Sequence, residues 1–314
     1  MSEKTNENKK TTENKKLNEK QKQLIYRVLF VVFALVFLIS MGIMIRDWYV
    51  QWEAEKQFED LSSMTQDSED ESDKTSESET ASESDTNTET ESESESETEI
   101  DELAALGITV PEKDLNWEEL YETNEHIYAW IYIPGTKVDY PILQHPTEDT
   151  YYLNRNLNGK KGYPGCVYSE TVTSKDFSDY NTLLYAHNMG NKTMFGSLHY
   201  FEDAQFFDEY RYVYIYTPET VLVYEIFAAY MYTDDHIYYN FDFGVAEGYQ
   251  DYIDEIFSIR DMKANIRRDT EVTTDTPMLT MCTCMSKTLR ENRYVVNAVL
   301  VNKSALKDIT PDED

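Results

Sequence analysis

The residues best suited to chemistry in this chain are a cysteine, an arginine and a histidine. Cys284 closes a strand-like run, Arg293 follows nine positions later, and His187 lies far upstream. A thiolate can attack a carbonyl carbon, an imidazole can move protons, and a guanidinium can hold the substrate carbonyl or the oxyanion. Together these side chains suffice for acyl transfer, provided that the fold brings them together.

Each of the three residues lies at the end of a run rich in β-forming residues. Cys284 precedes a polar loop and Arg293 opens the next run, so a hairpin would bring the guanidinium close enough to stabilise the thiolate. His187 follows residues 183–186 and precedes a turn, a setting suited to acid–base work. Taken singly, the cysteine would be structural and the arginine a surface ion-pair residue. The other four histidines have no comparable setting, and we interpret them as surface or core residues: His126, His145, His199 and His236.

The cysteine count favours a working thiol over a metal site. Three cysteines, Cys166, Cys282 and Cys284, cannot supply four thiolate ligands, and the histidines show no H-E-x-x-H spacing. We expect Cys166 to be a buried apolar side chain. Cys282 would share a strand face with Cys284 but be less activated. The sequence therefore predicts no metal and no cofactor.

The first half of the chain predicts an anchor and a tether. Residues 1–27 form a basic tail, and residues 28–47 form an apolar segment just long enough to cross a bilayer. The basic flank predicts a cytoplasmic N-terminus and an extracellular C-terminus. A cleaved signal peptide is the alternative, but Arg46, Asp47 and Trp48 make a poor cleavage site.

Residues 48–100 predict a juxtamembrane segment and a disordered Ser/Glu-rich linker. Fifteen Asp and Glu against the single Lys74 give residues 61–100 a charge of -14, out of a net charge of -32. So few apolar residues cannot offset the entropy of folding. The tract is either a spacer or a tolerated insert. The acidic chain also argues against a nucleic-acid partner.

Residues 101–314 predict one folded domain that is mainly β. Doubly wound α/β fits poorly, because helices do not alternate with strands. We expect a mostly antiparallel β-barrel with peripheral helices. One or two short helices are expected over residues 114–130 and another over 248–259, with strands over 129–133, 138–143, 180–186, 211–217, 222–232, 278–284 and 293–301.

Several separated motifs resemble the sortase family, and among its members class B. The resemblance covers roughly residues 114–302 and rests on motifs that agree in order. The signature Thr-Leu-x-Thr-Cys is matched by residues 280–284 with Met281 in place of Leu, and the arginine followed by Val-Val is matched by residues 293–296. Class B members often carry an acidic residue two positions after the nucleophile, where this chain has Ser286. Residues 181–189 with 193–198, residues 130–142, 151–154 and the helix over 248–259 also look like class B.

The resemblance implies an eight-stranded sortase-type β-barrel and cysteine transpeptidation. It makes Cys284 the nucleophile, His187 the general acid/base and Arg293 the stabiliser of the substrate carbonyl and oxyanion, with Thr283 and Asn188 as substrate-binding residues. The substrate would be the C-terminal sorting signal of a secreted protein, cleaved after its threonine. An amine of a peptidoglycan precursor or a pilin would resolve the thioacyl-enzyme.

The combined expectation is a single-pass membrane enzyme whose residues 28–47 lie in the bilayer and whose catalytic domain lies outside the cell. Two alternatives stay open. One is a hydrolytic cysteine protease that uses the same site. The other is a non-catalytic, membrane-tethered binding module in which the cysteine is structural.

Overall fold

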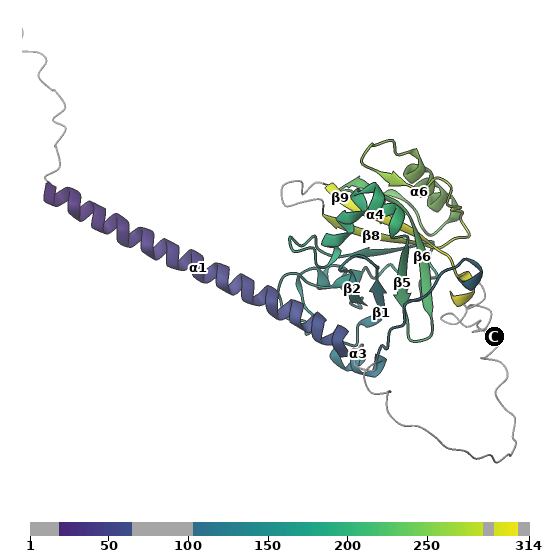
Figure 1. The fold of residues 1–314 in the computed structure, drawn as a ribbon, viewed down its shortest axis with the longest axis horizontal. Helices are drawn as coiled ribbons and strands as arrows, with labels where there is room; N and C mark the ends of the chain where they lie inside the picture. Colours follow the sequence, from purple (N-terminus) through teal and green to yellow (C-terminus); the bar gives the residue numbers. More distant parts are fainter. Residues whose placement is uncertain (1–18, 65–102, 285–291, 307–314) are drawn as a thin grey trace, which may run out of the picture. The chain divides into compact units, whose positions relative to one another are not determined.

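The computed structural model describes residues 19–64, 103–284 and 292–306. The chain divides into two compact units, Met1–Val50 and Gln51–Asp314, and each is described by itself (Figure 1).

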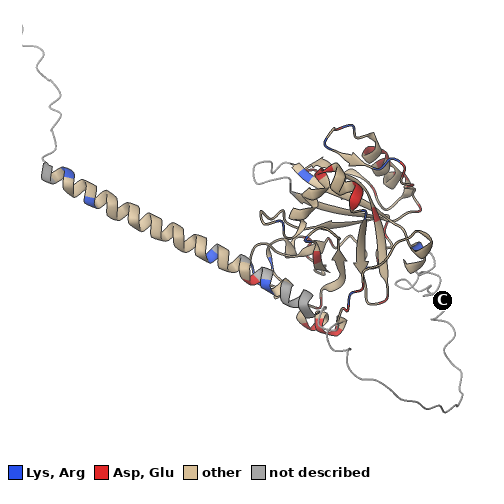
Figure 2. Cartoon of the chain, viewed as in Figure 1, with Lys and Arg blue, Asp and Glu red and all other residues tan. Residues whose placement is uncertain are grey.

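Most of helix α1 (Glu19–Met64) lies in the first unit, which ends at Val50. Within α1, the stretch Gln21–Val50 is long and apolar enough to cross a membrane. Figure 2 shows this stretch as almost uncharged, and no Lys, Arg, Asp or Glu lies between Arg27 and Arg46. The helix continues to Met64, so residues 48–64 are helical and only residues 65–100 of the expected linker lie outside the described residues.

The second unit is built on a closed barrel of eight strands, as the resemblance implied. The order around the barrel is β1-β2-β3-β4-β8-β9-β6-β5, and β5 pairs with β1 to close it. All neighbours are antiparallel except β2 with β3 and β4 with β8. A short additional strand, β7 (Asn265–Ile266), pairs with β6. The barrel strands are β1 (Ile127–Tyr132), β2 (Asp139–Leu143), β3 (Val167–Ser169), β4 (Asn181–Tyr185), β5 (Tyr212–Tyr216), β6 (Val221–Thr233), β8 (Met278–Cys284) and β9 (Asn292–Leu300).

Strands β8 and β9 carry buried apolar residues on both faces, because a separate hydrophobic core packs against each face. Leu279 and Met281 of β8 pack into the larger core, whereas Met278 and Cys282 pack into a second core with α6 (Ala246–Ser258). Successive side chains of a strand alternate between its faces, so one strand serves both cores. α6 lies outside the barrel (Figure 1), and its buried face carries the aromatic and aliphatic residues that the sequence predicted: Tyr249, Tyr252, Ile253 and Ile256.

The helix expected over residues 114–130 is shorter than predicted, and the shortest strands were not predicted. Helix α3 is confined to Trp117–Thr123, with the Asn116 side chain accepting from the backbone N–H of Glu119 at its N-terminus. The chain then enters β1 at Ile127, so residues 127–130 are strand and not helix. β3 and β7 are too short to show a period. Further helices are α4 (Ala204–Glu209), α5 (Ile237–Asn240) and the 3-10 turns η1 (Tyr151–Asn154), η2 (Phe195–Glu202) and η3 (Lys303–Ala305).

Candidate active site

The ends of three adjacent strands bring the predicted chemical residues together. β4 and β8 are parallel, with Tyr185 opposite Cys282. Cys284 is the last residue of β8, and His187 follows Tyr185 by two residues, so both lie at the same edge of the sheet. β9 runs antiparallel to β8 and places Arg293 directly opposite Cys284. The backbone thus gathers Cys284, His187 and Arg293 at one end of the β4-β8-β9 ribbon.

Two hydrogen bonds hold the ends of β4 and β8 together. The Ala186 N–H donates to the Cys282 carbonyl at 3.4 Å. The Thr283 hydroxyl donates to the Ala186 carbonyl at 2.8 Å, and Thr283 is only 3% exposed. Because these bonds join the residues that flank His187 and Cys284, they limit how far the two strand ends can slide apart.

The imidazole of His187 is oriented by a backbone carbonyl. Its Nε2 lies 2.8 Å from the Leu153 oxygen. A carbonyl oxygen can only accept, so Nε2 carries the hydrogen of this bond and Nδ1 is the nitrogen that titrates. The ring also packs against Tyr163, with 4.6 Å between ring centroids. Burial lowers the pKa of His187 below its ordinary value of 6.5, and the hydrogen bond to Leu153 opposes that effect by raising it.

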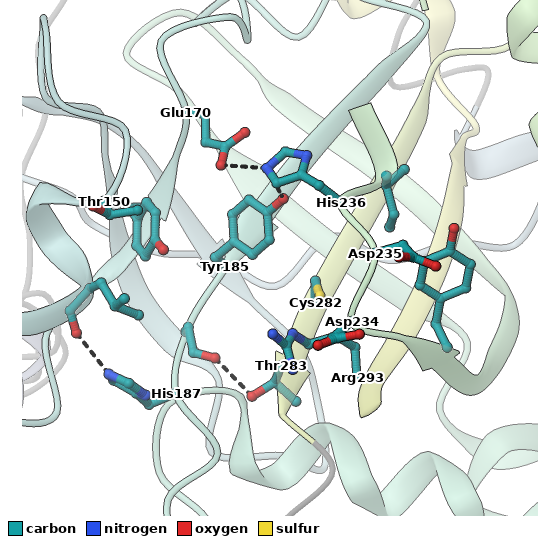
Figure 3. Close-up of a pocket in the computed structure, with 15 residues that line it drawn as sticks. Thr150, Glu170, Tyr185, His187, Asp234, Asp235, His236, Cys282, Thr283 and Arg293 are labelled. Atoms are coloured by element: carbon teal, nitrogen blue, oxygen red, sulfur yellow. Dashed lines mark hydrogen bonds and ion pairs between the residues drawn. The ribbon is translucent and has the colours of Figure 1, made fainter. Parts of the chain in front are cut away.

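A pocket of about 310 Å³ lies against these strand ends. His187, Thr283 and Arg293 line it together with Cys282 (Figure 3). The remaining wall is largely aromatic and aliphatic, with carboxylates and a second histidine at one side: Thr150, Leu153, Tyr168, Glu170, Tyr185, Ala186, Tyr232, Asp234, Asp235, His236 and Ile237. An acyl-transfer substrate can therefore reach an imidazole and a guanidinium from one cavity.

Comparison with known proteins assigns the chain to a protein family. The model of the sortase domain matches residues 131–301, which is more than half of the chain. The chain belongs to the sortase family. Its similarities lie within class B: sortase B of Listeria monocytogenes is 29% identical over 186 residues, which cover 59% of this chain and 74% of that protein.

Solved class B sortases share the fold. A substrate complex of Staphylococcus aureus sortase B matches with a TM-score of 0.52 and 27% identity, covering 59% of this chain and 84% of that one. A sortase B complexed with triglycine matches with a TM-score of 0.52 and 27% identity, covering 60% and 86%. The eight-stranded sortase barrel expected from the sequence is confirmed.

Of the two expected substrate-binding residues of this sortase, one is among the described residues that line the pocket and the other is not. Thr283 lines the pocket, although its hydroxyl is occupied by the Ala186 carbonyl. Asn188 is not among the described residues that line the pocket. Its side-chain amide lies 2.9 Å from Nε2 of His199 instead.

A carboxylate–imidazole pair in the pocket wall was missed by the sequence analysis. Oε1 of Glu170 lies 2.8 Å from Nε2 of His236, and the Tyr185 hydroxyl lies 3.4 Å from the same nitrogen (Figure 3). Burial raises the pKa of Glu170, and the hydrogen bond to His236 opposes it. His236, interpreted from the sequence as a surface or core residue, thus lies in the pocket wall and is paired with a carboxylate. No local motif joins Glu170 to His236, because they are 66 positions apart and meet only in the folded barrel.

The two cysteines with described side chains are both buried. Cys166 is 1% exposed, and burial raises the pKa of its thiol far above the ordinary range. It is therefore the buried apolar side chain that the sequence predicted. Cys282 is 4% exposed at the base of the pocket. Among the described residues, no three His, Cys, Asp or Glu side chains are arranged to hold a metal ion.

Proposed function

We propose that this class B sortase is a cysteine transpeptidase that acts on C-terminal sorting signals. The observation that carries the proposal is the convergence of Cys284, His187 and Arg293 at the ends of β8, β4 and β9, beside one pocket. The substrate complex of S. aureus sortase B and the triglycine complex of a sortase B support a peptide donor and an amine acceptor.

In the first half of the reaction, the Cys284 thiolate attacks the carbonyl carbon of the sorting-signal threonine. The peptide nitrogen leaves with a proton from Nδ1 of His187, and a thioester to Cys284 remains. The Arg293 guanidinium donates hydrogen bonds to the developing oxyanion and keeps the thiol deprotonated. Cys282 lines the pocket, and side chains alternate along β8, so position 284 belongs to the same strand face as position 282. We therefore propose Cys284, at the end of this strand, as the nucleophile.

In the second half, the acceptor amine attacks the thioester carbon. The neutral imidazole of His187 takes the proton from that amine, the C–S bond breaks, and an amide forms. The lowered pKa of His187 favours this neutral form near pH 7. The Leu153 carbonyl keeps the hydrogen on Nε2 in both halves, so the same nitrogen gives and takes the proton.

We also propose that the reaction takes place on the outer side of the cell membrane. Residues 28–47 would lie in the bilayer with the N-terminus in the cytoplasm, because basic residues flank the apolar segment on its N-terminal side. The catalytic unit would then face the secreted proteins and the cell-wall precursor or pilin amines that are its proposed partners.

The test is ligation by the full-length protein in detergent micelles. A panel of threonine-containing sorting-signal peptides is incubated with triglycine, and the products are read by mass spectrometry. We expect a peptide–triglycine product that Cys284→Ala abolishes and Cys166→Ala retains, since Cys166 is buried away from the pocket. Cleavage without ligation would indicate a hydrolytic protease, and no cleavage across the panel would favour a binding module.

A further inference from the structure

His199 of η2 contacts residues that are adjacent in sequence to two of the proposed catalytic residues. The His199 ring is stacked on Tyr294, with 4.7 Å between centroids and 22° between planes. Tyr294 is the neighbour of Arg293 on β9 and lies opposite Thr283 of β8. Through one edge of its ring, His199 also contacts Asn188, the neighbour of His187.

The hydrogen bonds fix the tautomer of His199. Nδ2 of Asn188 lies 2.9 Å from Nε2 of His199, and an amide nitrogen only donates, so Nε2 accepts. Nδ1 of His199 then carries the hydrogen and donates it to Oε1 of Glu202 at 2.6 Å. Donation therefore runs from Asn188 through His199 to Glu202, and this chain begins one residue from His187.

Backbone contacts also join the turn after His187 to the start of η2. The Phe195 N–H donates to the His187 carbonyl at 3.1 Å, and Asn188 pairs with Met194 in an isolated bridge. Gly196 lies so close to this turn that an added Cβ would come within 2.9 Å of the Met189 nitrogen. The turn that follows His187 is therefore packed onto η2, and the His199 side chain joins this turn to β9.

We propose that His199 is a positioning residue of this sortase, which sets the turn that carries His187 in register with the strand that carries Arg293. The proposal rests on the proposed function, because it concerns how the acid/base and the cation are held relative to each other. It gives Asn188 the task of transmitting this constraint, in place of the substrate contact expected from the sequence.

Two amide variants, each able to imitate one ring nitrogen of His199, separate its two hydrogen bonds. His199→Gln can put an amide oxygen where Nε2 accepts from Asn188, whereas His199→Asn can put an amide nitrogen where Nδ1 donates to Glu202. Both lose the ring that stacks on Tyr294, so the loss of stacking is common to the two variants. If His199 acts through Asn188, His199→Gln keeps more activity than His199→Asn, and both unfold at similar temperatures.

The experiment measures kcat and KM for ligation by the full-length protein in micelles. We expect His199→Asn to lower kcat by about 10- to 100-fold with KM nearly unchanged, as for a small misplacement of a catalytic group. His199→Asn and Asn188→Ala combined should be no worse than the poorer single variant, because both break one chain. Equal kcat for His199→Gln and His199→Asn, or fully additive losses, would overturn the positioning role.

A second measurement does not depend on turnover. In protein with ¹⁵N-labelled histidine, the imidazole signals of His187 should shift in His199→Asn and stay close to wild type in His199→Gln. An unchanged His187 signal in His199→Asn overturns the positioning role even if the wild type proves inactive. An inactive wild type with the expected shifts would overturn the proposed function alone.

Discussion

Replacing Gly165 by alanine should disturb the proposed acid/base without touching it. Gly165 has a φ of +74°, and an added Cβ would overlap the carbonyl oxygens of Tyr152 and Leu153 and lie 2.8 Å from the Leu153 carbonyl carbon. The Leu153 oxygen is the one that accepts the hydrogen bond from His187. Gly165→Ala must therefore move the group that orients the imidazole.

The size of the effect follows from this hydrogen bond. Such a bond contributes about 1.5–3 kcal/mol when the donor is charged and about 0.5–1.5 kcal/mol when it is neutral. Losing it costs the imidazolium about 1 kcal/mol more than the imidazole, so the pKa of His187 falls further below its ordinary value. At a pH above that pKa the imidazolium fraction drops about fivefold. Proton donation to the leaving amine slows by at least that factor, and misorientation can extend the loss to about 100-fold.

The assay titrates the five histidines by NMR of ¹⁵N-labelled imidazoles and measures kcat over the same pH range. Gly107→Ala is the control for backbone strain, about 1–2 kcal/mol at positive φ, because Gly107 has a φ of +69° with nothing within 4 Å of the added Cβ. Gly190→Ala is a second control, because Gly190 lies in the turn after His187 and an added Cβ there also meets nothing within 4 Å. If Gly165→Ala titrates like wild type, or Gly107→Ala loses as much activity, the reasoning about Leu153 is refuted.

Three further predictions concern the same domain. Arg293→Lys should lower kcat/KM for ligation about 100-fold, because an ammonium cannot reproduce the forked donors of the guanidinium, and kinetics within a few-fold of wild type would contradict that role. Cys282→Ala should retain activity within about tenfold and leave the acyl adduct on Cys284, as read by peptide mapping. Deleting residues 1–100 should give a soluble domain that ligates like the full chain, as judged by gel filtration and the ligation assay, whereas an unfolded product would place the domain boundary elsewhere.

The sequence predicted the barrel and the candidate catalytic trio because both leave local signals. Long strands such as β6 and β9 show runs of β-branched and aromatic residues, and Cys284, Arg293 and His187 lie in motifs at strand ends. α6 was recognisable because four buried residues recur at helical spacing. These features can be read within a window of about ten residues.

The rest could not be predicted because it depends on pairing between distant segments. The Glu170–His236 pair joins residues that are 66 positions apart and that no short motif links. The backbone oxygen of Leu153 that orients His187 has no residue-type signal, since every residue carries a carbonyl. β3 owes its strand form to neighbours on both sides, because its three residues form a parallel pair with β2 and an antiparallel pair with β4.

Trapping the acyl-enzyme tests directly whether Cys284 is the nucleophile. The full-length protein is mixed with a cleaved peptide in the absence of amine, quenched in acid within the first turnovers, and mapped by mass spectrometry. We expect an adduct equal to the N-terminal part of the peptide through its threonine, carried on Cys284 and lost when triglycine is added before the quench. An adduct on Cys282, or turnover with no adduct on any cysteine, would contradict it.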